Sequence, residues 1–460
     1  MRFLLTLAMA AFSSTVVAGD FETLKQTNWH QWRGPLANGV APGADPPTVW
    51  DTEKNVRWKT TIPGQGSGTP IVWQDRIFLL TAIETEQKGQ ADARPRTPVR
   101  LVAQADPPTR PPERRRRRGW FGGGGGAPEN VYQFVVMCLD RATGETVWQQ
   151  TAIEAVPHEG IHNTASYASS SPITDGENLY VFFGSEGVYS YTLDGELRWK
   201  RDLGDLYIRN SFGEGASPAL YQGVLVVPWD HERQSKLFAL DAETGDTLWQ
   251  VERDEATTWE TPLIVEHEGT VQVVMTGTPK AMGYDLETGT VLWECGGQAM
   301  NPVASPVEKD GVAYCMTARR GNALFAIPLS ARGDITGSDK IAWSYNRGTS
   351  YVPSPLLYGE RLYFCKSNNG ILTCLDADTG AVRFAEERLP GVRAVYASPL
   401  GAGGRVYISG RNGVTLVLKD ADTLEVLAEN DLEEAIDASP LAVGKELFLR
   451  TATQLYCIAE

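Results

Sequence analysis

The run His158–His162 reads His-Glu-Gly-Ile-His, a pattern whose residue types can do chemistry. Two histidines four residues apart on a helix can bind zinc, and the glutamate between them can act as a general base. Pro157 precedes the run and Gly160 lies inside it, and both residues disfavour a helix. We therefore expect a polar loop here rather than a zinc-binding helix.

The same imidazoles can be metal ligands without a helix. His158 or His162 could join His231 and a carboxylate such as Glu214 from other parts of the chain. Imidazole and carboxylate groups are common zinc ligands in proteins. One hypothesis is therefore a metal-dependent activity at a histidine cluster, with these four residues as the metal candidates.

Further charged, amide and aromatic side chains are spread over several loops. Together they could bind a small polar or anionic ligand through ion pairs and ring stacking. They could equally satisfy one another as a ring of salt bridges, because charged groups that line a channel need partners with or without a ligand. No pattern assigns a catalytic residue. The candidate ligand-binding residues are His158, His162, Arg209, Asn210, Glu214, Asp230, His231, Trp259, Glu260, Asn301, Arg320, Tyr351 and Lys366.

The elements that position these residues follow from a repeat. Each unit begins with Ser-Pro or Thr-Pro, continues through alternating apolar strands with turn residues between them, and ends near Thr-Gly and Trp. Successive marker prolines lie 41 to 49 residues apart, except that 102 residues separate the first two. The markers are Pro70, Pro172, Pro218, Pro262, Pro306, Pro355, Pro399 and Pro440. Each unit reads as four short antiparallel strands.

Four-stranded units repeated around an axis predict an all-β fold, an eight-bladed β-propeller. The chain ends on a third strand at residues 454–460, and residues 55–60 supply a fourth strand from the other end. We expect that N-terminal strand to close the ring within the last blade, because closure leaves no free sheet edge. The expected organisation is a signal peptide at 1–18, a lead-in segment at 19–54 and the propeller at 55–460, with a basic, glycine-rich insertion at 86–130.

Three segments carry a resemblance to a known family: LDRATGETVW at 139–148, LDAETGDTLW at 240–249 and YDLETGTVLW at 284–293. They resemble the tryptophan-docking motif of the pyrroloquinoline quinone (PQQ)-like propellers, a superfamily that includes quinoprotein dehydrogenases and the outer-membrane assembly factor BamB. The resemblance implies that the motif Trp packs against the neighbouring blade. It also implies either a non-catalytic binding or interaction scaffold or an oxidoreductase that uses PQQ and calcium on alcohols or sugars.

The residues of the sequence favour the scaffold. The chain has no adjacent cysteine pair, no Cys-x-x-Cys-His haem attachment and no Gly-x-Gly-Asn turn of the kind that supplies the family's Asn ligand to calcium. Glu214 and Asn301 are conceivable Ca²⁺ ligands, but no aspartate partner stands out. PQQ and calcium therefore remain possible cofactors on the resemblance alone, and binding scaffold is the leading hypothesis.

Loop length predicts which face of the propeller is functional. The connections between blades are long, for example at 155–168, 206–216, 346–352 and 389–397, and they share one face with the turns between the second and third strands of each blade. The turns on the other face are short. We expect the ligand or partner site on the face with the long loops.

Charge and leader sequence limit location and partners. The first 18 residues have the basic start and apolar run of a cleaved signal peptide, and no cysteine stands directly after them to carry a lipid anchor. We therefore expect a periplasmic or secreted protein without a transmembrane segment. The net charge of −15 argues against nucleic-acid binding.

The segment 86–130 carries ten basic and five acidic side chains. Arg114–Arg118 within it suggest surface association or a cationic flap, and a tolerated insertion with no fixed fold is the simpler interpretation.

The six cysteines are expected mainly as core residues of strands. If Asn369 and Gly370 form a two-residue hairpin turn, Cys365 lies opposite Cys374. A disulfide between them and two packed thiols are then the alternatives.

Overall fold

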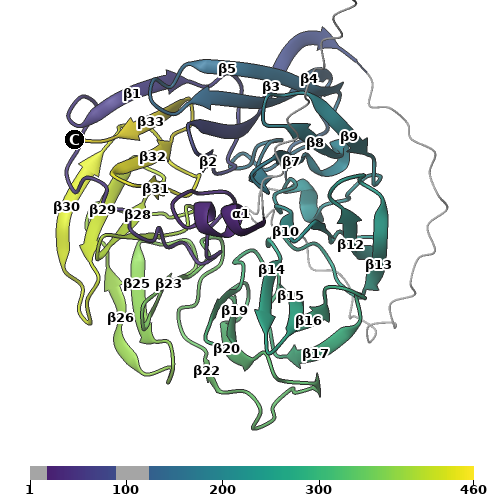
Figure 1. The fold of residues 1–460 in the computed structure, drawn as a ribbon. Helices are drawn as coiled ribbons and strands as arrows, with labels where there is room; N and C mark the ends of the chain where they lie inside the picture. The colour runs from purple at the N-terminus through teal and green to yellow at the C-terminus, as the bar shows by residue number, and fades with distance from the viewer. Residues whose placement is uncertain (1–17, 90–123) are drawn as a thin grey trace, which may run out of the picture.

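A computed structural model describes residues 18–89 and 124–460, and it shows eight β-sheets arranged radially around one axis (Figure 1). Each sheet is a blade with at least four strands, and the four main strands run antiparallel in every blade. The expected eight-bladed β-propeller is confirmed. Alternating apolar residues give each strand a buried face, so that successive blades pack face to face around the ring.

The strands of the first four blades follow the chain from the inside of the ring outward. Blade 1 holds β2 (Ile71–Trp73), β3 (Arg76–Lys88), β4 (Asn130–Asp140) and β5 (Thr146–Ala155). Blade 2 holds β6 (Ile173–Thr174), β7 (Asn178–Phe182), β8 (Val188–Thr192) and β9 (Leu197–Arg201). Blade 3 holds β10 (Ala219–Tyr221), β11 (Val224–Trp229), β12 (Ser235–Asp241) and β13 (Thr247–Arg253). Blade 4 holds β14 (Leu263–His267), β15 (Thr270–Thr276), β16 (Lys280–Asp285) and β17 (Val291–Gly296), with β21 (Gly333–Asp334) parallel to β17.

The last four blades continue in the same order. Blade 5 holds β18 (Val307–Lys309), β19 (Val312–Thr317), β20 (Ala323–Pro328) and β22 (Trp343–Tyr345). Blade 6 holds β23 (Leu356–Tyr358), β24 (Arg361–Cys365), β25 (Ile371–Asp376) and β26 (Val382–Arg388). Blade 7 holds β27 (Leu400–Ala402), β28 (Arg405–Ser409), β29 (Val414–Lys419) and β30 (Val426–Asp431). Blade 8 holds β31 (Leu441–Val443), β32 (Glu446–Arg450), β33 (Gln454–Ile458) and, from the other end of the chain, β1 (Val56–Thr61).

Strand β1 closes the ring as expected. It pairs antiparallel with β33, with Lys59 opposite Tyr456 and Thr61 opposite Gln454. Blade 8 therefore takes three strands from the C-terminal part of the chain and one from the N-terminal part. This pairing ties the two ends of the propeller together and covers the outer edge of β33.

A ring of hydroxyl groups joins all eight blades on the inside. The residue before each marker proline is Ser or Thr, and its backbone N–H donates to the hydroxyl of the equivalent residue in the next blade, as from Thr69 to Ser171 at 2.9 Å. The eight bonds are 2.8–3.2 Å long, and the last runs from Ser439 back to Thr69. We call Thr69, Ser171, Ser217, Thr261, Ser305, Ser354, Ser398 and Ser439 the hydroxyl ring.

Tryptophans on the outer strands contact the neighbouring blade. The indole N–H of Trp148 donates to the carbonyl of Leu193 at 2.9 Å, and the same contact joins Trp199 to Ala242 at 3.0 Å. A Cβ added at Gly195 would lie 2.8 Å from the Trp148 ring, and Gly195 has φ 89°. The glycine of the Thr-Gly turns, or its equivalent, thus leaves room for the indole of the preceding blade.

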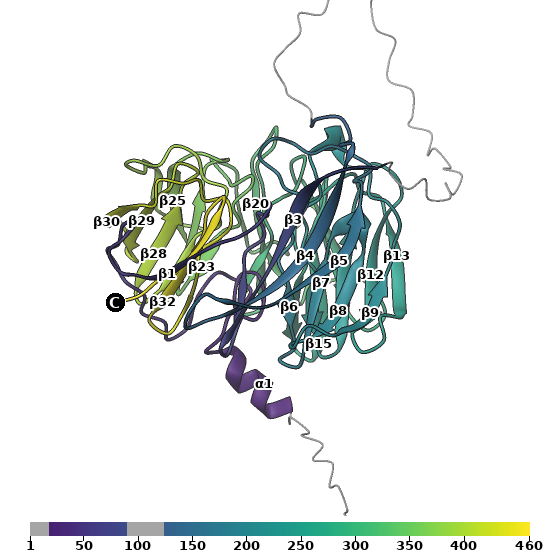
Figure 2. The same ribbon diagram turned by 90° about the horizontal axis from the view of Figure 1, so that it is seen from above.

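The lead-in segment crosses the central axis of the propeller (Figure 1). It starts with helix α1 (Ala18–Lys25), which protrudes from the face opposite the far end of the β3–β4 hairpin (Figure 2). Its backbone then bonds to Val72 in blade 1, Thr174 in blade 2 and Gly401 in blade 7. Two further short helices are single 3₁₀ turns, η1 (Gly184–Glu186) and η2 (Arg209–Ser211).

The described ends of the insertion, 86–89 and 124–130, are part of the folded structure, and the rest of it lies outside the described residues. Strand β3 runs to Lys88 and β4 begins at Asn130, so both strands reach into the insertion. Gly124 and Gly125 donate backbone hydrogen bonds to the carbonyls of Asn210 and Ile161. A Cβ at Gly124 would lie 1.7 Å from the carbonyl oxygen of Ser211, so this close approach needs glycine. Arg114–Arg118, and the surface association expected of them, lie outside the described residues.

Cys365 and Cys374 do not face each other, so the register expected from a two-residue turn is wrong and the alternative of two separate thiols holds. Cys365 lies opposite Leu372, and Cys374 lies opposite Tyr363. The turn is longer than two residues, because Lys366 bonds to Ile371 and residues 366–370 form the connection. All six cysteines are buried free thiols.

Candidate functional site

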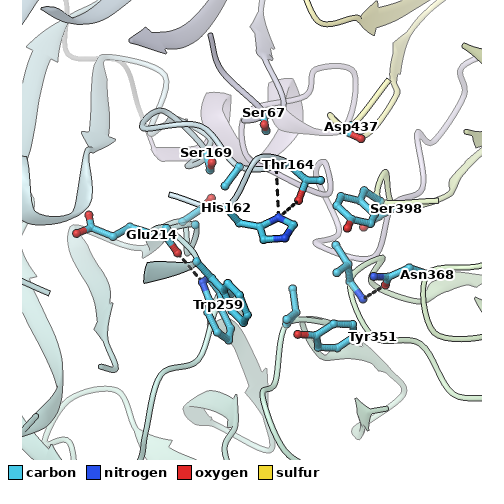
Figure 3. A pocket seen from close by; sticks show the side chains of 18 of the residues that line it. Ser67, His162, Thr164, Ser169, Glu214, Trp259, Tyr351, Asn368, Ser398 and Asp437 are labelled. Carbon is cyan, nitrogen blue, oxygen red and sulfur yellow. Dashed lines mark hydrogen bonds between the residues drawn. The ribbon is translucent and has the colours of Figure 1, made fainter. Parts of the chain in front are cut away.

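A cavity of about 690 Å³ opens within the propeller. Its walls come from the connections between blades and from two turns between second and third strands, at Arg319–Arg320 and Asn368. Those are the loops that loop length had singled out. The labelled side chains in Figure 3 surround this space from several blades.

The floor of the cavity is lined by hydroxyl groups. Six members of the hydroxyl ring line it: Thr69, Ser171, Ser217, Thr261, Ser398 and Ser439. Each of these oxygens accepts one backbone N–H, and within residues 18–89 and 124–460 none of them donates to a protein acceptor. Because a hydroxyl can donate as well as accept, each keeps one O–H for a water or a ligand oxygen.

Aromatic rings form part of the wall. Trp259 is held by its indole N–H, which donates to the carbonyl of Gly213 at 2.7 Å, and its ring lies 6.4 Å from that of Phe212. Tyr351 and Tyr396 line another part of the cavity, and Trp32 reaches it from the lead-in segment. Flat rings beside hydroxyl donors suit a ligand that is both polyhydroxylated and partly apolar.

Glu214 contributes a carboxyl that points away from the centre of the cavity (Figure 3). One of its oxygens accepts the backbone N–H of Ser185 at 2.7 Å, and the other accepts the Ser185 hydroxyl at 2.5 Å. Burial, which outweighs these hydrogen bonds, raises the pKa of Glu214 to about 8. Gly184 makes this position possible, since a Cβ there would lie 1.5 Å from a carboxyl oxygen. The group is therefore largely protonated at neutral pH.

Arginines provide the charge at the cavity. Arg319 and Arg320 line it, and neither has a carboxylate within ion-pair distance in the described part of the chain. Arg319 lies over the Tyr351 ring at 5.7 Å. Arg411, by contrast, donates two hydrogen bonds of 2.6 and 3.0 Å to the carboxylate of Asp437, and its guanidinium lies over the ring of Tyr396.

The histidine candidates do not converge. His158 contacts the carbonyl of Leu206 at 2.8 Å, and His162 contacts the Thr164 hydroxyl at 2.8 Å inside the cavity. His231 accepts the Tyr207 N–H, and burial lowers its pKa. Residues 158–162 form a loop, as expected. Over residues 18–89 and 124–460, no three His, Cys, Asp or Glu side chains are grouped to hold a metal ion.

Six of the thirteen candidate residues line the cavity: His162, Asn210, Glu214, Trp259, Arg320 and Tyr351. The other seven lie elsewhere and bond within the protein. Asp230 forms a buried ion pair with Arg253 at 2.9 Å, and Glu260 accepts the backbone N–H of Thr276. Arg209 bridges Glu232 and Asn301, Lys366 pairs with Glu386, and His158 and His231 make the contacts given above.

Sequence reasoning missed the hydroxyl ring and the lead-in as parts of the site. The signal for the ring was present, because Ser or Thr precedes every marker proline. The lead-in gave no comparable signal, since its Trp32 reaches the cavity only through the path of the folded chain.

Comparison with known proteins identifies the family. Residues 133–386 and 340–460 match the family described as outer membrane protein assembly factor BamB. The chain belongs to this family. No curated protein gives a significant match. No helix among residues 18–89 and 124–460 is long and apolar enough to cross a membrane.

Solved structures show the same fold at low sequence identity. BamB from Moraxella catarrhalis is 13% identical with a TM-score of 0.50, over 73% of this chain and 94% of that one. The quinohemoprotein alcohol dehydrogenase of Comamonas testosteroni is 11% identical with a TM-score of 0.61, over 96% and 82%. The alcohol dehydrogenase ADHIIG of Pseudomonas putida HK5 is 10% identical with a TM-score of 0.58, over 95% and 81%. The BamB family propeller thus also resembles quinoprotein enzymes in fold.

The residues at the cavity do not fit a PQQ–calcium pair. Ca²⁺ requires six to eight oxygen ligands, with carboxylates among them. Both oxygens of Glu214 are bonded to Ser185, and both oxygens of Asp437 are bonded to Arg411. Asn301, the other conceivable ligand, accepts a hydrogen bond from Arg209 and does not line the cavity. Among residues 18–89 and 124–460, the two carboxyl groups that line the cavity are thus both bonded to other protein groups.

Proposed function

We propose that this protein is a periplasmic or secreted, non-catalytic binding scaffold whose central cavity takes a small polar ligand. The observation that carries the proposal is the set of six ring hydroxyls that line the cavity, each with an O–H that has no acceptor among the described protein residues. Such donors, set beside Trp259 and Tyr351, suit a ligand with many oxygen atoms and at least one flat apolar face. Membership of the BamB family supports a scaffold role.

An oxidoreductase that uses PQQ and calcium is the alternative, because of the likeness in fold to alcohol dehydrogenases. Its test adds PQQ and Ca²⁺ to the purified protein and measures dye-linked alcohol and sugar oxidation together with the thermal shift. We expect neither activity nor stabilisation, since the carboxylates beside the cavity are already bonded. Turnover with a matching rise in Tm would overturn the proposal.

A variant with a filled cavity tests binding directly. Val303 lines the cavity and its side chain makes no hydrogen bond, so Val303→Trp should occupy ligand space. Val382 is 52% exposed on the outer strand β26, and Val382→Trp is the matched control. We expect some members of a panel of sugars, sugar acids and nucleosides to raise the Tm of the wild type and the control but not of Val303→Trp. A panel that stabilises all three proteins equally, or none, would contradict the proposal.

A further inference from the structure

The charges around the cavity are opposite in sign to those of the protein as a whole. The chain carries a net charge of −15, yet Arg319 and Arg320 line the cavity without a carboxylate partner in the described residues. The two carboxyl groups that line it add little negative charge. Asp437 is neutralised by Arg411, and Glu214 is largely protonated at neutral pH because burial raises its pKa to about 8.

A buried arginine of the lead-in is bonded to residues that adjoin the hydroxyl ring. Arg33 is 4% exposed, and its guanidinium donates to the carbonyls of Pro399 at 2.8 Å and Pro355 at 2.7 Å. These carbonyls belong to the prolines that follow ring members Ser398 and Ser354. Burial lowers the pKa of Arg33 to about 9, with no carboxylate nearby to oppose that effect. The group stays charged at neutral pH, and in residues 18–89 and 124–460 no carboxylate forms an ion pair with it.

A second buried arginine lies beside the same ring in blade 8. Arg450 is 3% exposed and donates to the carbonyls of Gly68 and Leu80, both at 2.9 Å. Gly68 adjoins ring member Thr69. Burial lowers the pKa of Arg450 to about 10, again without an opposing carboxylate. Carbonyl dipoles hold both guanidinium groups, but neither group has a carboxylate partner in the part of the chain that the structure describes.

We infer that the ligand of the cavity is an acidic one: a polyhydroxylated molecule whose carboxylate, phosphate or sulfate group is seated on the hydroxyl ring. The inference rests on the proposed binding function and adds the class of ligand. The ring supplies O–H donors, Arg33 and Arg450 supply positive potential behind it, and Arg319 and Arg320 attract the ligand at the wall. An oxyanion is the group that accepts several hydrogen bonds and also compensates buried cations.

The experiment compares acidic and neutral probes of similar shape by titration calorimetry. Trigalacturonate is paired with galactotriose for carboxylates, and inositol hexakisphosphate is paired with myo-inositol for phosphates. We expect at least one acidic probe to bind at least tenfold more tightly than its neutral partner, and the pair that responds identifies the oxyanion. Its affinity should fall with added salt, since the attraction is electrostatic.

Variants assign the binding to the cavity. The double variant Arg319→Gln/Arg320→Gln should lose about tenfold in affinity for the acidic probe with an unchanged Tm, because Arg319 is partly exposed, Arg320 is exposed and neither carries an ion pair in the described structure. Arg388→Gln is the control, an exposed arginine at the end of β26. A third variant replaces Arg114–Arg118 by serine and should bind like the wild type.

Three results overturn the inference. If the acidic and the neutral probe of each pair bind with equal affinity, the ligand needs no negative charge and the inference is wrong. The cavity would still bind a ligand, so the proposed function would stand. Loss of binding only in the variant without Arg114–Arg118 would assign the acidic probes to the insertion. Failure of both acidic probes to bind would end the inference, and the Val303→Trp comparison would then decide the proposed function separately.

Discussion

The backbone N–H of Ser439 donates a 3.0 Å hydrogen bond to the hydroxyl of Thr69, and this contact joins the last blade to the first. It completes a ring in which each blade is bonded to the next through the same pair of atoms. The closure of the propeller thus has two parts, an inner hydroxyl ring and the outer pairing of β1 with β33.

The Thr69 hydroxyl should contribute measurably to stability. Thr69→Val removes the acceptor and leaves the buried N–H of Ser439 without a partner, a loss that costs about 1–3 kcal/mol in the free energy of unfolding. Thr69→Ser keeps the acceptor and should lose much less. Denaturant unfolding of the three proteins checks this, and equal losses in both variants would show that the hydroxyl does not matter.

Stability should fall as pH rises through the range set by Glu214. Its folded pKa of about 8 lies above the usual value of 4.5, so the folded state holds a proton that the unfolded state has released. The contribution of Glu214 to the free energy of unfolding is therefore largest below about pH 4.5. It decreases progressively as the pH rises toward 8, by at most a few kcal/mol. Glu214→Gln should flatten that part of the curve. Glu255, whose pKa burial also raises to about 8, leaves a remaining slope of the same sign.

Substitutions of Trp148 should lower the free energy of unfolding, and the loss should grow with the part of the side chain that is removed. Trp148→Phe keeps most of the ring over Gly195 but loses the hydrogen bond to Leu193, and should cost about 1 kcal/mol. Trp148→Ala also opens a gap between blades 1 and 2 and should cost about 3 kcal/mol. Thermal or denaturant unfolding separates the two, and a neutral Trp148→Ala would refute the contact as a stabilising one.

Glycines at the anchored end of the insertion should control its protease sensitivity. A Cβ at Gly160 would lie 2.0 Å from the carbonyl oxygen of Gly125, so Gly160→Ala should release residues 124–129 from the loop beside the cavity. The Tm should change little, because residues 125–127 on the released side of the contact are exposed. Limited proteolysis with mapping of the cut sites measures the effect. Gly126→Ala, where an added Cβ meets nothing within 4 Å, is the control.

The fold could be predicted because each blade repeats the same local pattern. Alternating apolar residues, turn residues and the marker prolines recur in every unit, and the strand at 55–60 completed a blade that otherwise lacked one. Features that depend on the length of a single turn were harder to predict from the sequence. Cys365 and Cys374 lie out of register because residues 366–370 form a longer connection than the pair Asn369–Gly370 suggested.

The cavity lies on the face that loop length indicated, but only six of the thirteen candidate residues line it. Loop length identified the face, since long loops have room to form a cavity. It could not distinguish Glu214, which lines the cavity, from Asp230, which is buried against Arg253 in the wall of the ring. The direction of a side chain from a loop depends on tertiary contacts such as those of Ser185 and Gly184. The positions of Arg33 and Arg450 beside the hydroxyl ring could not be predicted from the sequence for the same reason.

The lead-in segment lies between two separate cavities. Trp32 lines the 690 Å³ cavity, whereas His30 and Gln31, its neighbours in the chain, line a separate cavity of about 720 Å³ near α1. The two cavities share no lining residue, so this segment divides the axis of the ring into two compartments. If the proposed ligand binds in the first cavity, we therefore expect it to enter and to leave on the face with the long loops.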